Sequence, residues 1–191
     1  MSITLGSDDI IEALNETLAD QQVGARVLLA VPADQVTLMA IEVVDARTIP
    51  ARAEGEPVAP VAGLPTVKLA DNGEPSITPV DGPPPADLKA QPLIKGAGPA
   101  VVSGQTLTLH YSGWLWDGTA FDSSWDGAPF STKIGTGAVI PGWDQGLVGQ
   151  TVGSQVLLVI PPALGYGDAG SGEKIPGDST LVFVVDILDA S

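Results

Sequence analysis

The chain has 191 residues, enough for one large domain or for one and a half small ones. Its 23 acidic residues outnumber its 8 basic ones, and the net charge of −15 excludes binding to nucleic acid or to an anionic membrane, because both require clustered cations. The absence of cysteine excludes a thiol nucleophile, a thiolate metal site and a disulfide framework.

The sequence contains no feature typical of a secreted, membrane-spanning or metal-binding protein. The first residues lack a basic region and a long apolar stretch, so we expect no signal peptide. The most apolar run, residues 156–160, is too short to cross a bilayer and ends at Pro161. No Asp-x-Asp-x-Asp-Gly loop is present, and we expect neither a metal nor a cofactor. As written, the chain is expected in the cytoplasm; export is the alternative if the chain is a fragment of a longer precursor.

Residues 1–47 are predicted to be a degenerate partial copy of the back half of the C-terminal domain. Ten residues from Gly6 to Pro32 find an identical residue at a constant offset of 129. The register then changes to an offset of 144, so the copy lacks about fifteen residues, including the loop that carries Tyr166.

This partial copy has also lost its aromatic rings. Leu14 stands where Trp143 stands, and Met39 stands where Phe183 does. Nothing in residues 1–10 supplies a front half, so the strands of the copy would leave unpaired edges. This favours the hypothesis that the chain is a fragment of a longer tandem-domain protein.

Residues 48–91 are predicted to be a linker and an extended lead-in, because they hold much of the proline and glycine of the chain. Three consecutive prolines at residues 83–85 make part of the segment semi-rigid. Residues 67–69 and 76–78 are predicted to form short edge strands.

Residues 92–191 are predicted to form the C-terminal domain, which begins with β-structure. Apolar and polar residues alternate in residues 105–111, as in a half-buried strand. This alternation places Tyr111 on the core face and leaves His110 solvated on the other face.

A helix and two further strands complete the predicted domain. Residues 141–149 suit one short helix, with a proline near its start and a glycine at its end. Trp143 and Leu147 share the helix face that would pack on the sheet. Residues 155–160 and 180–188 are β-branched runs bounded by turn residues, which predicts strands.

Aromatic residues make up only 5% of the chain, yet most fall in or beside four short clusters. Leucine and valine would suffice for a small core, so rings placed near turns, one of them beside an aspartate, indicate an aromatic-walled pocket that opens to the surface. The clusters are Phe121-Asp122-Ser123-Ser124, Val139-Ile140-Pro141-Gly142-Trp143, Leu164-Gly165-Tyr166-Gly167 and Phe183.

These clusters, together with Tyr111-Ser112-Gly113 and Gly118-Thr119, resemble the motifs of FKBP-type peptidyl-prolyl cis-trans isomerases, the immunophilin family that binds macrolides. The resemblance covers residues 92–189 in full and residues 5–46 as the half-copy. It implies an α+β fold in which a curved antiparallel β-sheet wraps around one short helix, with the active pocket between them. Proline-containing polypeptides and macrolides are the implied partners, and we expect a monomer.

The resemblance also implies the residues of the site. Trp143 would be the floor of the pocket, Val139 and Ile140 its rim, and Ile175 part of a flap over its mouth. The implied catalytic residues are Phe121, Asp122, Tyr166 and Phe183, and the implied substrate-binding residues are Tyr111, Phe130, Val139, Ile140, Trp143 and Ile175.

Two departures from the family pattern concern Asp122 and the flap. Residues 126–128 lack the basic side chains that pair with the aspartate in many relatives, so Asp122 is expected to be held differently. The flap, residues 170–176, lacks the aromatic or histidine residue often found near its tip, which bears on substrate preference.

Such a pocket suits proline isomerisation because the reaction needs no nucleophile. An apolar site binds the twisted imide, which has lost resonance, better than the more dipolar planar bond. The plainer alternatives are that Trp143 is a packed core residue and that Asp122 begins a turn. The alternative function is a non-enzymatic chaperone or binding module that holds proline-containing segments in the same pocket.

Overall fold

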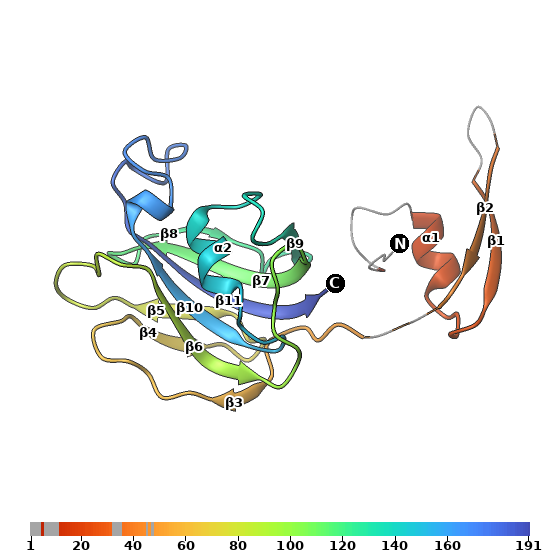
Figure 1. Cartoon of the computed structure of the whole chain (residues 1–191), viewed down its shortest axis with the longest axis horizontal. Helices are drawn as coiled ribbons and strands as arrows, with labels where there is room; N and C mark the ends of the chain where they lie inside the picture. Colours follow the sequence, from red (N-terminus) through yellow and green to blue (C-terminus); the bar gives the residue numbers. More distant parts are fainter. Residues whose placement is uncertain (1–4, 6–11, 32–35, 45, 47) are drawn as a thin grey trace. The chain divides into compact units, whose positions relative to one another are not determined.

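The structure is a computed structural model of the whole chain, and it describes residues 5, 12–31, 36–44, 46 and 48–191. The chain divides into two compact units, Met1–Ile49 and Pro50–Ser191 (Figure 1). Within the described residues, no helix is long and apolar enough to cross a membrane, and no cluster of three acidic or histidine side chains is placed to hold a metal ion.

The first unit consists of a helix followed by a β-hairpin. Helix α1 (Glu12–Leu18) leads through a turn into strand β1 (Arg26–Val31), which pairs antiparallel with strand β2 (Thr37–Glu42). Gly24 in the turn has a φ of +90°, a conformation that favours glycine. Three of the matched positions, Gly6, Ile11 and Pro32, lie outside the described residues, and the half-copy stays a prediction.

The second unit is built on an antiparallel sheet of seven strands. They are β3 (Gly55–Pro57), β6 (Lys89–Gly96), β7 (Thr106–Leu115), β8 (Ala120–Ser123), β9 (Phe130–Lys133), β10 (Gln155–Ile160) and β11 (Leu181–Ala190). The strand order is β3-β6-β10-β11-β7-β8, and β9 also pairs with β7. The apolar strands β10 and β11 therefore lie at the centre of the sheet.

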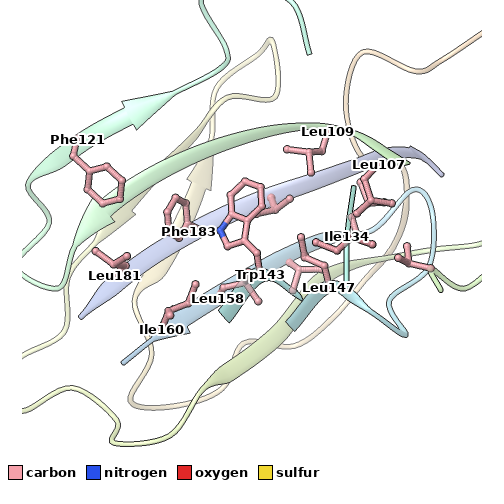
Figure 2. Close-up of a cluster of buried hydrophobic side chains, with 14 of the residues drawn as sticks. Leu107, Leu109, Phe121, Ile134, Trp143, Leu147, Leu158, Ile160, Leu181 and Phe183 are labelled. Atoms are coloured by element: carbon pink, nitrogen blue, oxygen red, sulfur yellow. The ribbon is translucent and has the colours of Figure 1, made fainter. Parts of the chain in front are cut away.

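One short helix, α2 (Pro141–Leu147), packs on one face of this sheet (Figures 1 and 2). Trp143 and Leu147 lie on its buried side, as their spacing predicts, because residues four apart share a helix face. Gly146 lets the helix lie close to the sheet, since a Cβ there would come within 2.6 Å of the Leu158 side chain. The helix thus brings Trp143 directly over the central strands.

The other face of the sheet is covered by a two-stranded hairpin, β4 (Thr66–Leu69) and β5 (Pro75–Thr78). Val67 and Ile77 of this hairpin pack against Leu157, Val182 and Val184 of the central strands. Both faces of β10 are therefore buried, which explains why its sequence is an apolar run and does not alternate.

The structure differs from the prediction of a linker at residues 48–91, because residues 50–91 belong to the second unit. The two predicted edge strands correspond to β4 and β5, whereas β3 is not predicted from the sequence. Ala53 N–H donates to the buried Asp186 carboxylate at 2.8 Å, which ties this segment to β11. Proline is tolerated at the ends of edge strands, as at Pro57 and Pro75, so a high proline content does not exclude ordered structure.

Candidate active site

The ten residues implied by the resemblance all line one cavity of about 830 Å³ in the second unit. Its walls come from β7, β8, β9, the start of α2, the Tyr166 loop, the flap and β11. The remaining lining residues are Gly137, Ala138, Ser171, Gly172, Glu173 and Lys174. The structure therefore brings together every predicted site residue, while their individual roles stay predictions.

Trp143 lies at the bottom of this cavity and is 4% exposed. Pro141 occupies the first turn of α2, where a missing N–H removes no helix hydrogen bond, and the chain enters the helix directly from the rim residues Val139 and Ile140. The indole meets Tyr111 and Phe183 edge to face, with 5.3 Å between ring centroids in each case. These contacts fix the indole plane as an apolar surface.

Phe121 and Phe183 form a wall of the cavity. Their ring centroids lie 5.4 Å apart with the planes nearly perpendicular, and both side chains are buried. Gly113 of β7 lies behind both rings, because a Cβ there would come within 2.7 Å of Phe121 and 2.8 Å of Phe183. The missing side chain of Gly113 thus makes room for the two rings.

Asp122 is one of two carboxylates that line the cavity, the other being Glu173, and Tyr111 binds it through a hydrogen bond. The Tyr111 hydroxyl donates to Asp122 Oδ2 at 2.7 Å, and Ser123 N–H donates to Oδ1 at 2.9 Å. Burial, and then the neighbouring Asp122 carboxylate, raise the pKa of Tyr111, so the hydroxyl keeps its proton. Within the described part of the chain, no basic side chain forms an ion pair with Asp122.

The mouth of the cavity is bordered by Tyr166 and by the flap. Tyr166 is 39% exposed and precedes Gly167, whose φ of +62° turns the loop. Ile175 is buried, and it exchanges two backbone hydrogen bonds with Ser171 of 2.8 and 3.2 Å. Lys174 Nζ donates to the carbonyl oxygen of Phe121 at 3.1 Å, which connects the flap to β8.

Comparison with known proteins gives the same assignment for the second unit. The family model for the FKBP-type peptidyl-prolyl cis-trans isomerase matches residues 98–188. An FK506-binding protein of Streptomyces anulatus is 46% identical over 111 residues, which cover 56% of this chain and 89% of the relative. The chain belongs to the FKBP-type peptidyl-prolyl cis-trans isomerase family.

The other similarities agree with this family. The crystal structure of AtFKBP13 matches with a TM-score of 0.52 and 33% sequence identity, over 66% of this chain and 99% of that one. The α+β FKBP-like fold predicted from the sequence is thereby confirmed. FK506-binding protein 2 of Dictyostelium discoideum is 55% identical over 87 residues. The chain spans 65% of that protein's length, and the match covers 45% of the chain.

The roles of two residues at this FKBP-type site, Gly113 and Lys174, are not predicted from the sequence. Gly113 appears there only as part of a motif, although glycine inside a strand often marks a close approach of another group. Lys174 carries no signal in the sequence, because nothing there shows that its ammonium group reaches the Phe121 carbonyl.

The expectation that His110 is solvated is wrong. Its side chain is 7% exposed and stacks on Trp125, with 4.6 Å between ring centroids. Alternation correctly places His110 on the face opposite Tyr111, but Trp125 from the loop after β8 covers that face. His110 Nδ1 also forms a 3.0 Å hydrogen bond with the hydroxyl of Ser124.

The buried His110 predicts a pH dependence of stability. Burial lowers the pKa of His110 below its ordinary value of 6.5, although an interaction with the Ser124 backbone opposes this. The unfolded chain therefore takes up a proton first as the pH falls, so the free energy of unfolding should decrease below about pH 6.5, by at most about 1.4 kcal/mol per pH unit.

Urea denaturation between about pH 7.5 and 5.5 measures this effect. The His110→Phe variant keeps a ring against Trp125 but does not titrate, so the difference between the two proteins isolates His110 from the carboxylates. Parallel pH profiles for wild type and variant would contradict the prediction.

Proposed function

We propose that the second unit catalyses cis–trans isomerisation of peptide bonds that precede proline in polypeptide substrates, without a cofactor. The observation that carries this proposal is the cavity floored by Trp143 and walled by Phe121 and Phe183, with Asp122 at its side. Family membership of residues 98–188 supports it.

The proposed catalysis depends on the apolar character of the cavity. Resonance keeps a peptide bond planar, with a rotation barrier of roughly 18–20 kcal/mol. The twisted imide has lost this resonance and part of its charge separation, so a pocket of rings stabilises it relative to the planar bond. The proline ring rests on the indole of Trp143, and the edge-to-face contacts of the indole hold this surface in place.

Polar groups act on the rotating carbonyl in this proposal. Tyr166 is exposed at the mouth, where its hydroxyl is available to donate to the substrate. The backbone at Ile140, on the rim before α2, binds an extended substrate in this proposal. Asp122 is held by Tyr111 and adds a fixed negative charge at the wall. None of these groups forms a covalent bond with the substrate.

An exchange measurement tests the proposed activity. The full chain is added in catalytic amount to a short peptide with leucine before proline, and cis–trans exchange is measured by NMR without a coupling protease. Uncatalysed exchange takes tens to hundreds of seconds, so acceleration is readily detected. Binding of the peptide without faster exchange would replace the proposal by the alternative, a chaperone or binding module for proline-containing segments.

The pocket is also expected to bind FK506, as the names of the relatives say of those proteins. An apolar ring of this ligand would mimic proline, lie against Trp143 and keep the substrate out of the pocket. Because the ligand binds the native state, a concentration of 100 times Kd should raise the stability by about 2.7 kcal/mol. Calorimetry measures the heat of binding and a melting curve measures the shift in Tm. Neither depends on tryptophan fluorescence, to which Trp114, Trp116 and Trp125 would also contribute. No heat and no shift in Tm at saturating ligand would contradict the assignment of the pocket.

A further inference from the structure

The first unit has the same local structure as the back half of the second. Helix α1 and strand β1 coincide residue for residue with α2 and β10 at the offset of 129. The strand register is also shared, because Arg26 pairs with Glu42 where Gln155 pairs with Asp186. Both of these pairs are joined through their side chains, at 3.0 Å and 2.8 Å respectively.

The turn between helix and hairpin is shared as well. Gly24 has a φ of +90° and Gly153 a φ of +89°. Gly24 N–H donates to Val43 O at 2.6 Å, and Gly153 N–H donates to Ile187 O at 2.7 Å. An independent hairpin has no reason to reproduce the helix bounds, the register and the turn hydrogen bonds together.

The two hairpins differ in what covers them. In the second unit, Leu157 and Val182 are at most 1% exposed, because the β4–β5 hairpin and Trp114 cover this face. Their counterparts in the first unit, Leu28 and Leu38, are 71% and 65% exposed. The hairpin of the first unit thus keeps the apolar residues of this face, but no counterpart of the β4–β5 hairpin covers them in the described part of that unit.

The two hairpins also differ in whether their outer edges pair with further strands. In the second unit β10 pairs with β6 on one side, and β11 pairs with β7 on the other. In the described part of the first unit, β1 and β2 pair only with each other. Unpaired edges beside an exposed apolar face form a template for additional strands, and an isolated two-stranded hairpin is only marginally stable.

We propose that α1 and the β1–β2 hairpin form the back half of an FKBP-type domain and bind an FKBP-type front half. This front half is a polypeptide with the counterparts of β4 to β8, which pairs with both hairpin edges and covers Leu28 and Leu38. The second unit supports this choice of partner, because it shows which elements cover the same hairpin in a complete domain. Its own front half is already paired with β10 and β11, so the first unit requires another one.

The completed domain is not expected to be an isomerase. Leu14 occupies the position of Trp143. Met39 occupies the position of Phe183, because Met39 pairs with Leu29 as Phe183 pairs with Leu158. It would therefore lack the aromatic floor and one wall of the cavity.

A fusion protein tests this proposal on the full chain. A second copy of residues 50–129 is joined to the amino terminus, directly before Met1, which corresponds to Phe130 at the same offset. Hydrogen exchange is then followed at the backbone amides of β1 and β2, and protection should increase by about 100-fold or more as these strands become central. Unchanged exchange in the fusion, with the second unit folded, would overturn the proposal.

Two matched controls make the result specific. In the first control, prolines replace Leu109 and Ser112 in the added copy only, which removes strand pairing and should remove the protection. In the second, Leu38→Glu should lower the protection in the fusion but leave β1–β2 exchange of the unmodified chain unchanged, because Leu38 is exposed there.

Measurements on the unmodified chain test whether a second copy of the chain, and not a front half, covers the hairpin. We expect slow-exchange protection of β1 and β2 to be absent and the mass in solution to be that of a monomer. A dimer whose β2 amides are already protected would show that a second copy of the chain covers the hairpin, and it would overturn the proposal.

Discussion

Truncation of Phe183 to alanine should lower kcat/KM for X–Pro exchange by at least about tenfold, which corresponds to about 1.4 kcal/mol of transition-state stabilisation. The ring contacts Trp143 and Phe121 edge to face, at 5.3 and 5.4 Å between centroids. Its loss therefore leaves a gap beside Phe121 and removes one of the contacts that hold the indole of Trp143 in place. Water entering the cavity would favour the dipolar planar bond over the twisted one. Phe183→Leu, which keeps apolar bulk, should lose less activity.

The charge of Asp122 is expected to matter less than this wall. Asp122→Asn keeps the shape and an acceptor for Tyr111, and it should reduce kcat/KM by less than about fivefold. Phe183→Ala is also expected to cost roughly 3–5 kcal/mol of stability, so activity must be measured below the Tm of each variant. Abolished turnover in Asp122→Asn, beside a folded and nearly active Phe183→Ala, would make the carboxylate the main contributor.

A methyl group added at Gly113, which does not itself line the cavity, should impair the site by displacing the two rings packed against it. The new Cβ would lie 2.7 Å from Phe121 and 2.8 Å from Phe183, so at least one ring must move into the cavity. We expect Gly113→Ala to lower kcat/KM by about tenfold or more and to cost about 1–3 kcal/mol of stability through overpacking.

Gly127→Ala is the matched control for this substitution. Gly127 has no atom near the position of its Cβ and no positive φ, so alanine should change neither activity nor stability. Wild-type activity in Gly113→Ala would show that the two rings do not need their present positions, which would contradict the proposed role of the wall.

Two of the elements that position the site, β7 and α2, could be predicted because each depends on local sequence. Alternation through Tyr111 predicted β7, and the proline start with Trp143 and Leu147 four residues apart predicted α2. The cavity residues came from ordered motifs, and the structure places all of them around one space.

The remaining features depend on contacts between distant segments, which a sequence pattern does not contain. Alternation assigns His110 to a face of its strand but does not reveal that Trp125 covers it. Strand β3 was not predicted because residues 48–91 are rich in proline. This strand is held by pairing with β6 and by the nearby hydrogen bond from Ala53 N–H to the Asp186 carboxylate. Gly113 acquires its importance only from the two rings packed against it.

The central claim is that the aromatic floor of the second unit carries the activity, and the Trp143→Leu variant tests it most directly. Leucine is the residue that the first unit carries at the corresponding position, so the variant gives the second unit the floor of the first. NMR exchange of a proline peptide, with the variant folded as judged by a cooperative melt, should be at least about tenfold slower than with the wild-type chain. Exchange as fast as with the wild type would contradict the claim.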